Sequence, residues 1–159
     1  MAKEYTHRNL IVWQRAQELA VAVVKLVQQL PQNWANAVLA RQIIASATSI
    51  GANIAEGHGR YTIATYHNHL TIARGSTAET DSWLDLLRRT GYISPDEEQA
   101  LQHACSEIMA LLTHKMIVLN RAERDHKAGV REASEVYQVS GVSDVDEPPF
   151  PFVPGDYVE

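Results

Sequence analysis

The sequence predicts an all-α protein, an antiparallel up-and-down four-helix bundle. Three observations favour this fold class: apolar residues recur at three- and four-residue steps in four long segments, helix-ending residues separate these segments, and the chain has almost nothing that reads as a strand. Long helices joined by short links bury their apolar faces by packing side by side. At 159 residues, the chain is long enough for one domain with its own core.

The first helix is expected over residues 8–29, where leucine, valine and tryptophan side chains mark one buried face. Pro31 closes this segment, because the residue before a proline avoids the helical region. The second helix is expected over residues 36–56. We expect Gly57 or Gly59 to end it by taking the left-handed conformation.

The third helix is expected over residues 62–89, with Thr62 as its N-cap. Gly91 should end this helix, because glycine accepts a left-handed conformation after the last turn. Leucine and alanine side chains at helical spacing mark its buried face.

The fourth helix is expected over residues 95–127 and has the clearest start. Ser94 suits the N-cap, a proline follows at the first helical position, and Glu97 stands at the capping-box position. We expect Gly129 to stop this helix.

The chain divides into a bundle, residues 1–131, and an acidic proline-rich tail, residues 132–159. The bundle holds 14 basic and 12 acidic residues, while the tail holds seven acidic and no basic residues. Such a tail is disordered, or it docks on its own oligomer or on a partner. Aromatic side chains favour the docking alternative, and these are Phe150, Phe152 and Tyr157.

The lone cysteine and the lack of a long apolar segment indicate the compartment. Cys105 has no second cysteine to pair with, so an intramolecular disulfide is excluded and a reducing compartment fits best. We expect its side chain to be packed rather than reactive. No secretory signal or membrane span is visible. The expected location is therefore the cytoplasm, without membrane association.

No pattern of catalytic or metal-binding residues stands out. His67 and His69 lie two residues apart, on different sides of one helix, so they do not chelate one ion together. The sequence contains no HExxH, no CxxC and no Walker-type loop. We therefore expect a protein that is not an enzyme, with no metal, no cofactor and no small-molecule substrate.

Three stretches carry a resemblance to a known family, and they read LIVWQRAQELA, SIGANIAEGHGR and HLTIARGSTAE. They resemble the four-helix bundle proteins encoded in intervening sequences of bacterial large-subunit ribosomal RNA genes, often labelled S23 ribosomal proteins. A remoter branch is the accessory protein of diversity-generating retroelements. The resemblance covers about Leu10 to Leu119.

This resemblance implies an antiparallel bundle whose copies assemble into a ring, typically a homopentamer. Two features depart from the family pattern. The chain has Ile43, Ile44 and Ala45 where the family usually has arginine or lysine with alanine, and this weakens an RNA-facing interpretation of the second helix. The acidic tail also lies outside the pattern.

Polar residues at the end of the second helix predict an internal network. Asn53 and Glu56 share a helix face, and buried polar groups need partners. We expect a structural network that ties the second helix to the third. Its members are Asn53, Glu56, Arg60, Arg74 and Ser76. Gly75 should let the two helices approach closely.

Two classes of function remain open. The first is a non-enzymatic, oligomeric adaptor that binds structured RNA or an RNA-handling enzyme, and the second is a protein-interaction scaffold such as the partner of a retroelement reverse transcriptase. The candidate contact residues are Arg8, Arg15, Arg88, Arg89, Arg121, Arg124, Lys127 and Arg131. The alternative interpretation is that these cations belong to ordinary solvated helix faces.

Overall fold

The computed structural model describes residues 6–60 and 62–140, with side chains described up to residue 130. This part of the chain holds one short 3-10 helix and four α-helices. They are η1 (His7–Asn9), α1 (Ile11–Val27), α2 (Trp34–His58), α3 (Ile63–Arg89) and α4 (Pro95–Ser140). No strand occurs in the described ranges, so the predicted all-α class is confirmed.

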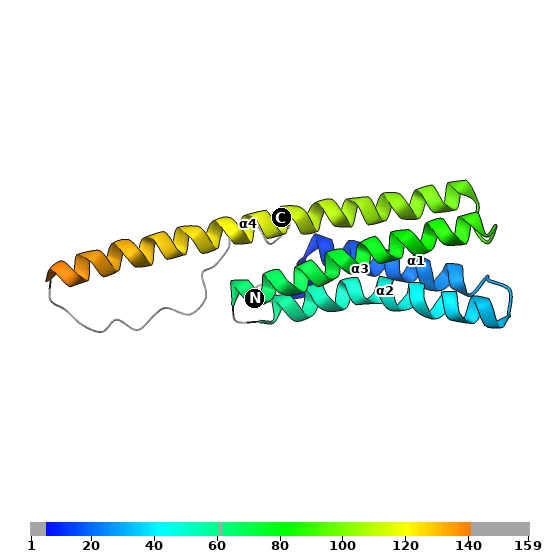
Figure 1. Cartoon of the computed structure of the whole chain (residues 1–159), viewed down its shortest axis with the longest axis horizontal. Helices are drawn as coiled ribbons and strands as arrows, with labels where there is room; N and C mark the ends of the chain where they lie inside the picture. Colours follow the sequence, from blue (N-terminus) through cyan, green and yellow to red (C-terminus); the bar gives the residue numbers. More distant parts are fainter. Residues whose placement is uncertain (1–5, 61, 141–159) are drawn as a thin grey trace, which may run out of the picture.

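The four helices pack around one continuous core (Figure 1). Helix α2 packs against α1 and α3, and α4 packs against α3 and α1. Each helix places fully buried aliphatic side chains in this core, such as Leu19, Ile50, Leu84 and Leu112. The helical spacing of apolar residues in the sequence is therefore a correct guide to the buried faces.

Local capping signals fix several helix ends as predicted. The Thr62 hydroxyl accepts from the Thr65 N–H at 3.1 Å. The Ser94 N–H donates to the Glu97 carboxylate at 2.8 Å, and the Glu97 N–H donates back to the Ser94 hydroxyl at 3.2 Å. Gly91 ends α3 with φ +77°, and its N–H donates to the Arg88 carbonyl.

The end of α2 differs from the prediction. The helix continues through Gly57 to His58, and Gly59 caps it with a right-handed φ of −81°. Neither glycine takes the left-handed conformation. Among the glycines of the described residues, Gly91 alone adopts it. Gly57 serves packing instead, because a Cβ there would lie 2.7 Å from the His69 Cβ.

The predicted stop of α4 at Gly129 is wrong. The helix continues through this glycine to Ser140. It therefore extends beyond the predicted end at residue 127 and includes the start of the predicted tail, which was expected from residue 132. A glycine inside a helix costs only about 1 kcal/mol relative to alanine, so its presence alone does not end a helix. Val130 comes next and is followed by the helix formers Arg131 and Glu132.

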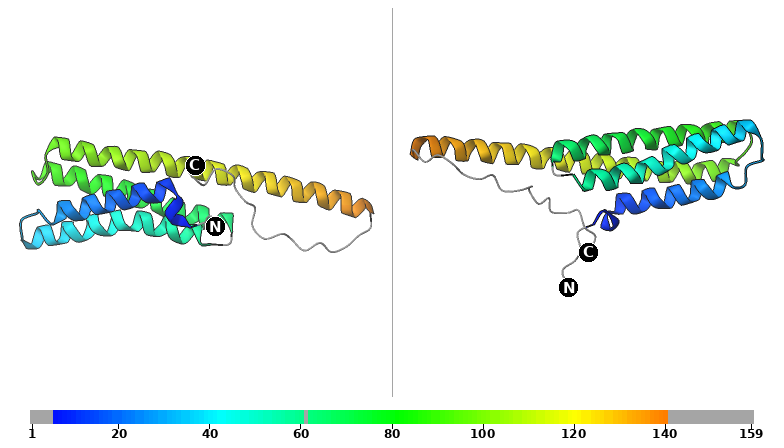
Figure 2. Two further views of the ribbon diagram at one scale, coloured as in Figure 1. Left: turned by 180° about the vertical axis from the view of Figure 1, so that it is seen from behind. Right: turned by 90° about the horizontal axis from the view of Figure 1, so that it is seen from below.

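Helix α4 extends well past the other three helices as a single rod (Figures 1 and 2). The end where it leaves the bundle is formed by η1, the start of α1 and the α2–α3 connection (Figure 2). Leu119 is the last fully buried residue of α4, and Val130 is exposed. The predicted docking residues Phe150, Phe152 and Tyr157 lie outside the described residues.

Gly57→Ala is expected to lower the free energy of unfolding by about 1–3 kcal/mol. The new Cβ would meet the His69 Cβ at 2.7 Å and the Tyr66 Cδ2 at 2.8 Å, and neither atom sits at the end of a flexible chain. Urea unfolding followed by far-UV circular dichroism measures the change.

Gly75→Ala provides the matched control. Gly75 is exposed within α3, and a Cβ there would meet no atom within 4 Å. This substitution is expected to leave stability unchanged or raise it by up to about 1 kcal/mol, through helix propensity alone. Equal losses in both variants would show that the α2–α3 approach does not limit stability.

Candidate functional site

A line of polar side chains runs between α2 and α3, and we call it the polar seam. Its members are Ser46, Ser49, Asn53, Glu56, Arg60, His69, Ser76 and Thr80. The members on α2 are Ser46, Ser49, Asn53 and Glu56, which recur at three- and four-residue steps and so share one face of that helix.

Hydroxyl groups make up the buried half of the seam. The Ser49 and Ser76 hydroxyls hydrogen-bond to each other at 2.9 Å. The Thr80 Oγ1 lies 3.0 Å from the Ser46 Oγ and 2.8 Å from the Ser76 carbonyl oxygen. Because Ser46, Ser76 and Thr80 are all buried, these bonds satisfy groups that water does not reach.

Asn53 joins the buried half to the exposed half. Its amide nitrogen donates to the Ser49 carbonyl at 2.9 Å, and its amide oxygen accepts from the His69 Nδ1 at 3.2 Å. The His69 Nε2 lies 3.8 Å from the Glu56 carboxylate, which also pairs with Arg60. The seam therefore ends in an ion pair beside the α2–α3 connection.

The structure brings together four of the five residues of the predicted network. Asn53, Glu56, Arg60 and Ser76 take part in it, whereas Arg74 is exposed and makes no hydrogen bond or ion pair with the described residues. Gly75 also points away from α2 and allows no close approach. His69, considered in the sequence only as a metal ligand, takes the place expected for Arg74.

Removing Asn53 is expected to cost more stability than removing Glu56. Asn53→Ala breaks bonds to three partner groups in a half-buried position and should lower the free energy of unfolding by about 1–3 kcal/mol. The Glu56 and Arg60 side chains are 50% and 49% exposed, so Glu56→Ala should cost less than about 1 kcal/mol.

Equilibrium unfolding of both variants beside the parent chain measures these two losses. Glu56→Ala is the control for the loss of a polar side chain from the same helix face. A larger loss for Glu56→Ala than for Asn53→Ala would show that the ion pair, rather than the amide, holds the seam together.

Four of the eight predicted contact cations are engaged in ion pairs. Arg15 binds Glu18 at 2.8 Å and Glu107 at 3.0 Å, and the hydrogen bond that it donates to Glu18 is the main cause of the raised pKa of Arg15. Arg88 and Arg89 bind nearby carboxylates at 2.9 and 2.7 Å. Lys127 is likewise bound to its own helix, through Glu123.

The remaining cations do not form one surface with these. Arg121 and Arg124 are exposed on the α4 extension, and neither makes an ion pair with the described residues. Arg88 and Arg89 lie at the opposite end of the bundle, near the start of α4 (Figure 1). The Arg131 side chain lies outside the described side chains.

Aromatic and basic side chains lie close together where α4 leaves the bundle, and we call this group the end cluster. Its members are His7, Arg8, Trp13, His58, Tyr66 and Lys115. They come from η1 and all four helices. No spacing in the sequence joins them, so of these six residues sequence reasoning selected Arg8 alone as a candidate contact.

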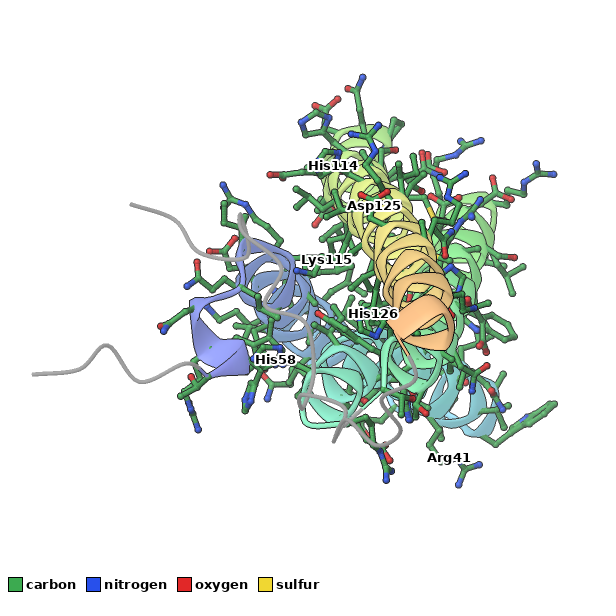
Figure 3. All side chains as sticks on the ribbon, turned by 90° about the vertical axis from the view of Figure 1, so that its left-hand side faces the viewer. Arg41, His58, His114, Lys115, Asp125 and His126 are labelled. Carbon is green, nitrogen blue, oxygen red and sulfur yellow. The ribbon has the colours of Figure 1, made fainter. Side chains whose placement is uncertain are left out.

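Two aromatic rings organise the end cluster. The buried Tyr66 ring has the His58 ring at 6.1 Å and the Lys115 ammonium at 5.8 Å from its centroid. The Trp13 indole has the His7 ring at 5.0 Å and the Arg8 guanidinium at 5.8 Å. Figure 3 views the molecule from this end, with His58 and Lys115 labelled. The cations thus sit against ring faces and edges.

Partial burial shifts two pKa values in the end cluster. Burial lowers the pKa of Lys115 from its ordinary value to about 8. The pKa of His58 is also lowered, first by burial and then by the positive charges of Lys115 and His7. Burial thus disfavours the charged form of both side chains, and for His58 the nearby positive charges add to this effect.

The Lys115 pKa predicts a pH-dependent stability difference. Between pH about 8 and 10.5 the unfolded chain holds more protons on Lys115 than the folded chain does, so this group's contribution to stability rises with pH. Below this window the ammonium is charged in both states, and folding bears the full cost of its burial. The stability of the parent chain relative to Lys115→Met should therefore rise as pH passes through this window.

Thermal unfolding of the two proteins across this pH range measures the difference. A difference that stays constant with pH would mean that Lys115 titrates alike in the folded and unfolded chains. Lys25→Met, at an exposed position in the last turn of α1, is the matched control and should show no such rise.

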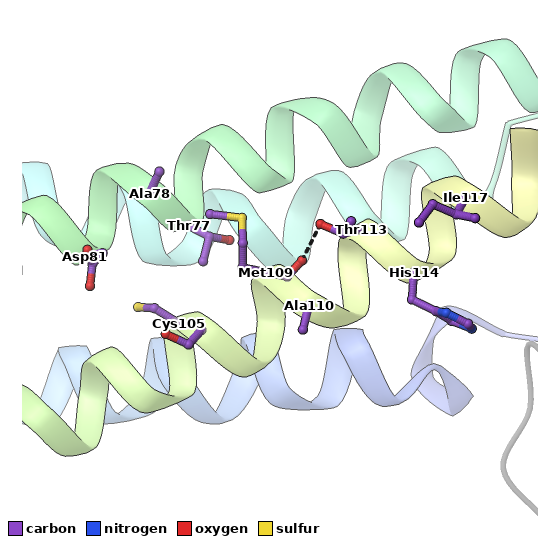
Figure 4. Close-up of a pocket in the computed structure, with 10 residues that line it drawn as sticks. Thr77, Ala78, Asp81, Cys105, Met109, Ala110, Thr113, His114 and Ile117 are labelled. Atoms are coloured by element: carbon purple, nitrogen blue, oxygen red, sulfur yellow. Dashed lines mark hydrogen bonds between the residues drawn. The ribbon is translucent and has the colours of Figure 1, made fainter.

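A groove of about 630 Å³ lies between α3 and α4 (Figure 4). Its lining includes Thr77, Met109 and the only cysteine, Cys105. Cys105 is buried, which confirms the expected packed side chain, and burial raises the pKa of its thiol to about 12. A thiol that stays protonated near neutral pH is a weak nucleophile.

In the part of the chain that the structure describes, no helix is both long and apolar enough to span a membrane. Within the same ranges, no group of three or more histidine, cysteine, aspartate or glutamate side chains has the arrangement of a metal site.

Comparison with known proteins identifies the family. The profile described as 23S rRNA-intervening sequence protein matches residues 8–114. The chain belongs to this family. The match ends just before Lys115, so it leaves out the rest of α4, including its extension past the bundle.

A solved structure supports the same relationship. It is the crystal structure of a protein of unknown function from the S23 ribosomal protein family of Bacteroides thetaiotaomicron. The two chains are 36% identical, with a TM-score of 0.63, and the similar region covers 67% of this chain and 98% of that one. No curated protein matches the chain significantly.

Proposed function

We propose that this protein is a non-enzymatic, RNA-associated adaptor that works as a homo-oligomer in the cytoplasm. The observation that carries the proposal is the match of residues 8–114 to a family whose description names 23S rRNA-intervening sequences. The partner is a structured RNA, bound directly or together with an enzyme that acts on it.

The use of the reactive side chains supports a non-enzymatic role. The Cys105 thiol is buried and its pKa is about 12, which disfavours a thiolate nucleophile. The hydroxyls, the amide and the imidazole of the polar seam are bonded to one another between α2 and α3. These groups therefore hold helices together.

The proposed assembly is a ring of up-and-down antiparallel bundles, with five copies favoured by the family resemblance. Opposite directions for α2 and α3 are supported by the seam, where Ser46, Ser49 and Asn53 meet Thr80, Ser76 and His69 in reverse order. Large apolar side chains on α1 and α2 are of the kind that a subunit contact covers, and they include Val21, Trp34 and Val38.

A ring would multiply each RNA-contacting cation by the number of copies. Repeated weak contacts raise overall affinity, because later contacts form within the complex. The exposed Arg121 and Arg124 on α4 have no carboxylate partner in the described residues, so they remain available to phosphate groups. Each such contact also makes binding more sensitive to salt.

Binding of nucleic-acid-free protein to total cellular RNA across a salt series tests the proposal. The double variant Arg121→Gln/Arg124→Gln should bind less tightly, and the slope of log affinity against log salt should fall by about 1.4 per copy engaged. The control is Arg88→Gln/Arg89→Gln, whose parent side chains are paired with carboxylates. It should bind like the parent chain.

Absence of RNA binding by the parent chain at low salt would overturn the proposal. A chain ending at Ser140, which keeps α4 whole, gives a second arm. The segment that it lacks contains acidic but no basic residues, so the shortened chain should bind RNA more tightly than the full chain.

A further inference from the structure

We propose that the groove between α3 and α4 is the docking site of this chain's own C-terminal segment, residues 141–159. In the docked state, Phe152 and Tyr157 occupy the groove, and the acidic residues before them lie against Arg121 and Arg124. The arginines and the segment lie past residue 114, where the family match ends. The docking is independent of the proposed function. Its consequence, a competition between the segment and RNA for the two arginines, rests on that function.

The groove offers an apolar surface that the described residues leave uncovered. Its volume is about 630 Å³. Ala78 from α3 and Ala110 and Ile117 from α4 are exposed along it, and Ile117 is 54% exposed. Figure 4 shows Asp81 and Cys105 at one end of the groove and Ile117 at the other. An apolar segment lying in this groove would remove these side chains from water, which favours docking.

Two cations of α4 continue the same helix face beyond the groove. One row of side chains runs along this face at steps of three and four residues, and its members are Ala110, His114, Ile117, Arg121 and Arg124. Arg121 and Arg124 are exposed and have no carboxylate partner among the described residues. The row therefore passes from an apolar part in the groove to a positively charged part on the α4 extension.

Carboxylates near this row leave its charge in place. Glu123 pairs with Lys127 on its own helix. Asp125, next to Arg124 in the sequence, is turned about 100° from it around the helix axis. Asp81 lines the groove at the end far from the arginines. An acidic segment is therefore attracted to the arginine end of the row.

The order of residues in the C-terminal segment matches the row when the chain reverses direction after α4. Residues 141–159 contain five acidic and no basic residues. Three of the acidic residues come first, Asp144, Asp146 and Glu147, and the sequence PPFPFVP follows them. A segment that runs back along α4 from Ser140 meets the arginines first and the groove second. Acidic residues then face cations, and apolar residues face the apolar groove.

The length of the segment also matches. Ser140 follows Ile117 by 23 residues and Met109 by 31 residues, which correspond to about 35 and 47 Å of helix at about 1.5 Å per residue. Phe152 and Tyr157 follow Ser140 by 12 and 17 residues, and an extended chain covers at most about 40 and 56 Å over these lengths. Phe152 therefore reaches the near end of the groove and Tyr157 its middle, and the excess length leaves room for a turn.

The prolines of the segment favour this mode of binding. Each proline fixes φ, so the segment loses less conformational entropy on docking than an ordinary chain of the same length does. The prolines are Pro148, Pro149, Pro151 and Pro154. Proline-rich segments bind grooves in extended form, with their side chains in apolar contact. The composition of the segment thus suits the shape and the chemistry of the groove.

Methyl NMR spectra of the full chain test the docking. Phe152→Ser/Tyr157→Ser removes both aromatic rings from the groove, so the methyl signals of Met109 and Ile117 should move downfield as the ring currents are lost. The methyl signals of Val21, an exposed residue of α1, should stay in place. Unchanged signals of Met109 and Ile117 would overturn the docking.

Val142→Ser/Val145→Ser is the matched control. It also replaces two apolar residues of the segment, but these valines follow Ser140 too closely to reach the groove. It should move none of the groove signals. All four substituted positions lie past the described helices, so the variants keep the contacts of the bundle intact.

Mixed assemblies identify whose segment occupies the groove. The isotope-labelled parent chain is reassembled with an excess of unlabelled Phe152→Ser/Tyr157→Ser chains. The Met109 and Ile117 signals should keep their parent positions, because each labelled chain brings its own segment. Movement to the positions of the variant would overturn docking within one chain in favour of a neighbouring copy's segment.

Neutralising either side of the charge contact tests its part in the docking. Asp144→Asn/Asp146→Asn/Glu147→Gln and Arg121→Gln/Arg124→Gln should each move the groove signals part of the way toward the undocked positions. The combined variant should move them no further than either set alone, since both sets remove the same contact. Additive movements would overturn the pairing of the acidic residues with the arginines.

RNA affinity, measured by fluorescence anisotropy with an oligoribonucleotide, separates the docking from the proposed function. Docked segments hold the arginines away from RNA, so the apparent affinity falls in proportion to the undocked fraction. Phe152→Ser/Tyr157→Ser should therefore bind RNA about threefold more tightly than the parent chain at low salt. An unchanged affinity would overturn the competition. Moved groove signals without RNA binding by either chain would keep the docking and overturn the adaptor proposal.

Discussion

The close contact between α2 and α3 determines where the polar groups of this protein lie. Gly57 lets the Tyr66 and His69 side chains pack against the end of α2. His69 is thereby placed to bond Asn53, and the Tyr66 ring is placed between His58 and Lys115. The close helix contact at Gly57 therefore helps to position residues of both the polar seam and the end cluster.

The two polar regions handle their charges differently. In the seam, hydrogen bonds join the groups from Ser46 to His69, and Glu56 pairs with Arg60 at the exposed end, so the groups stabilise one another. In the end cluster, the Lys115 ammonium and the His58 ring both lie near the buried Tyr66 ring, and burial disfavours the charged form of each. The first arrangement stabilises a fixed helix pair, whereas the second places titratable groups where charge is costly.

Ion pairing also divides the surface cations into two sets. Arg15, Arg88, Arg89 and Lys127 each bind a carboxylate, so their fields are largely cancelled at a distance. Arg121 and Arg124 on α4 form the other set, since neither has a carboxylate partner among the described residues. Net charge, which is −5 for the chain, does not reveal this distribution.

The sequence by itself determined the features that depend on neighbours within a few residues. Helix faces follow from apolar spacing, and the caps at Thr62, Ser94 and Gly91 follow from local hydrogen bonding and backbone freedom. The same local reasoning fails at Gly129, because glycine permits a helix end without requiring one. The effect of a glycine thus depends on the structure that surrounds it.

Only the tertiary structure decided which distant side chains meet. Arg74 and His69 lie on the same predicted helix, and the rotation of α3 against α2 selects His69 as the partner of Asn53. The end cluster draws on η1 and all four helices, so no short stretch of sequence contains its pattern. Local patterns fix helices because their hydrogen bonds are local, whereas a site between helices depends on packing distances that only the assembled core sets.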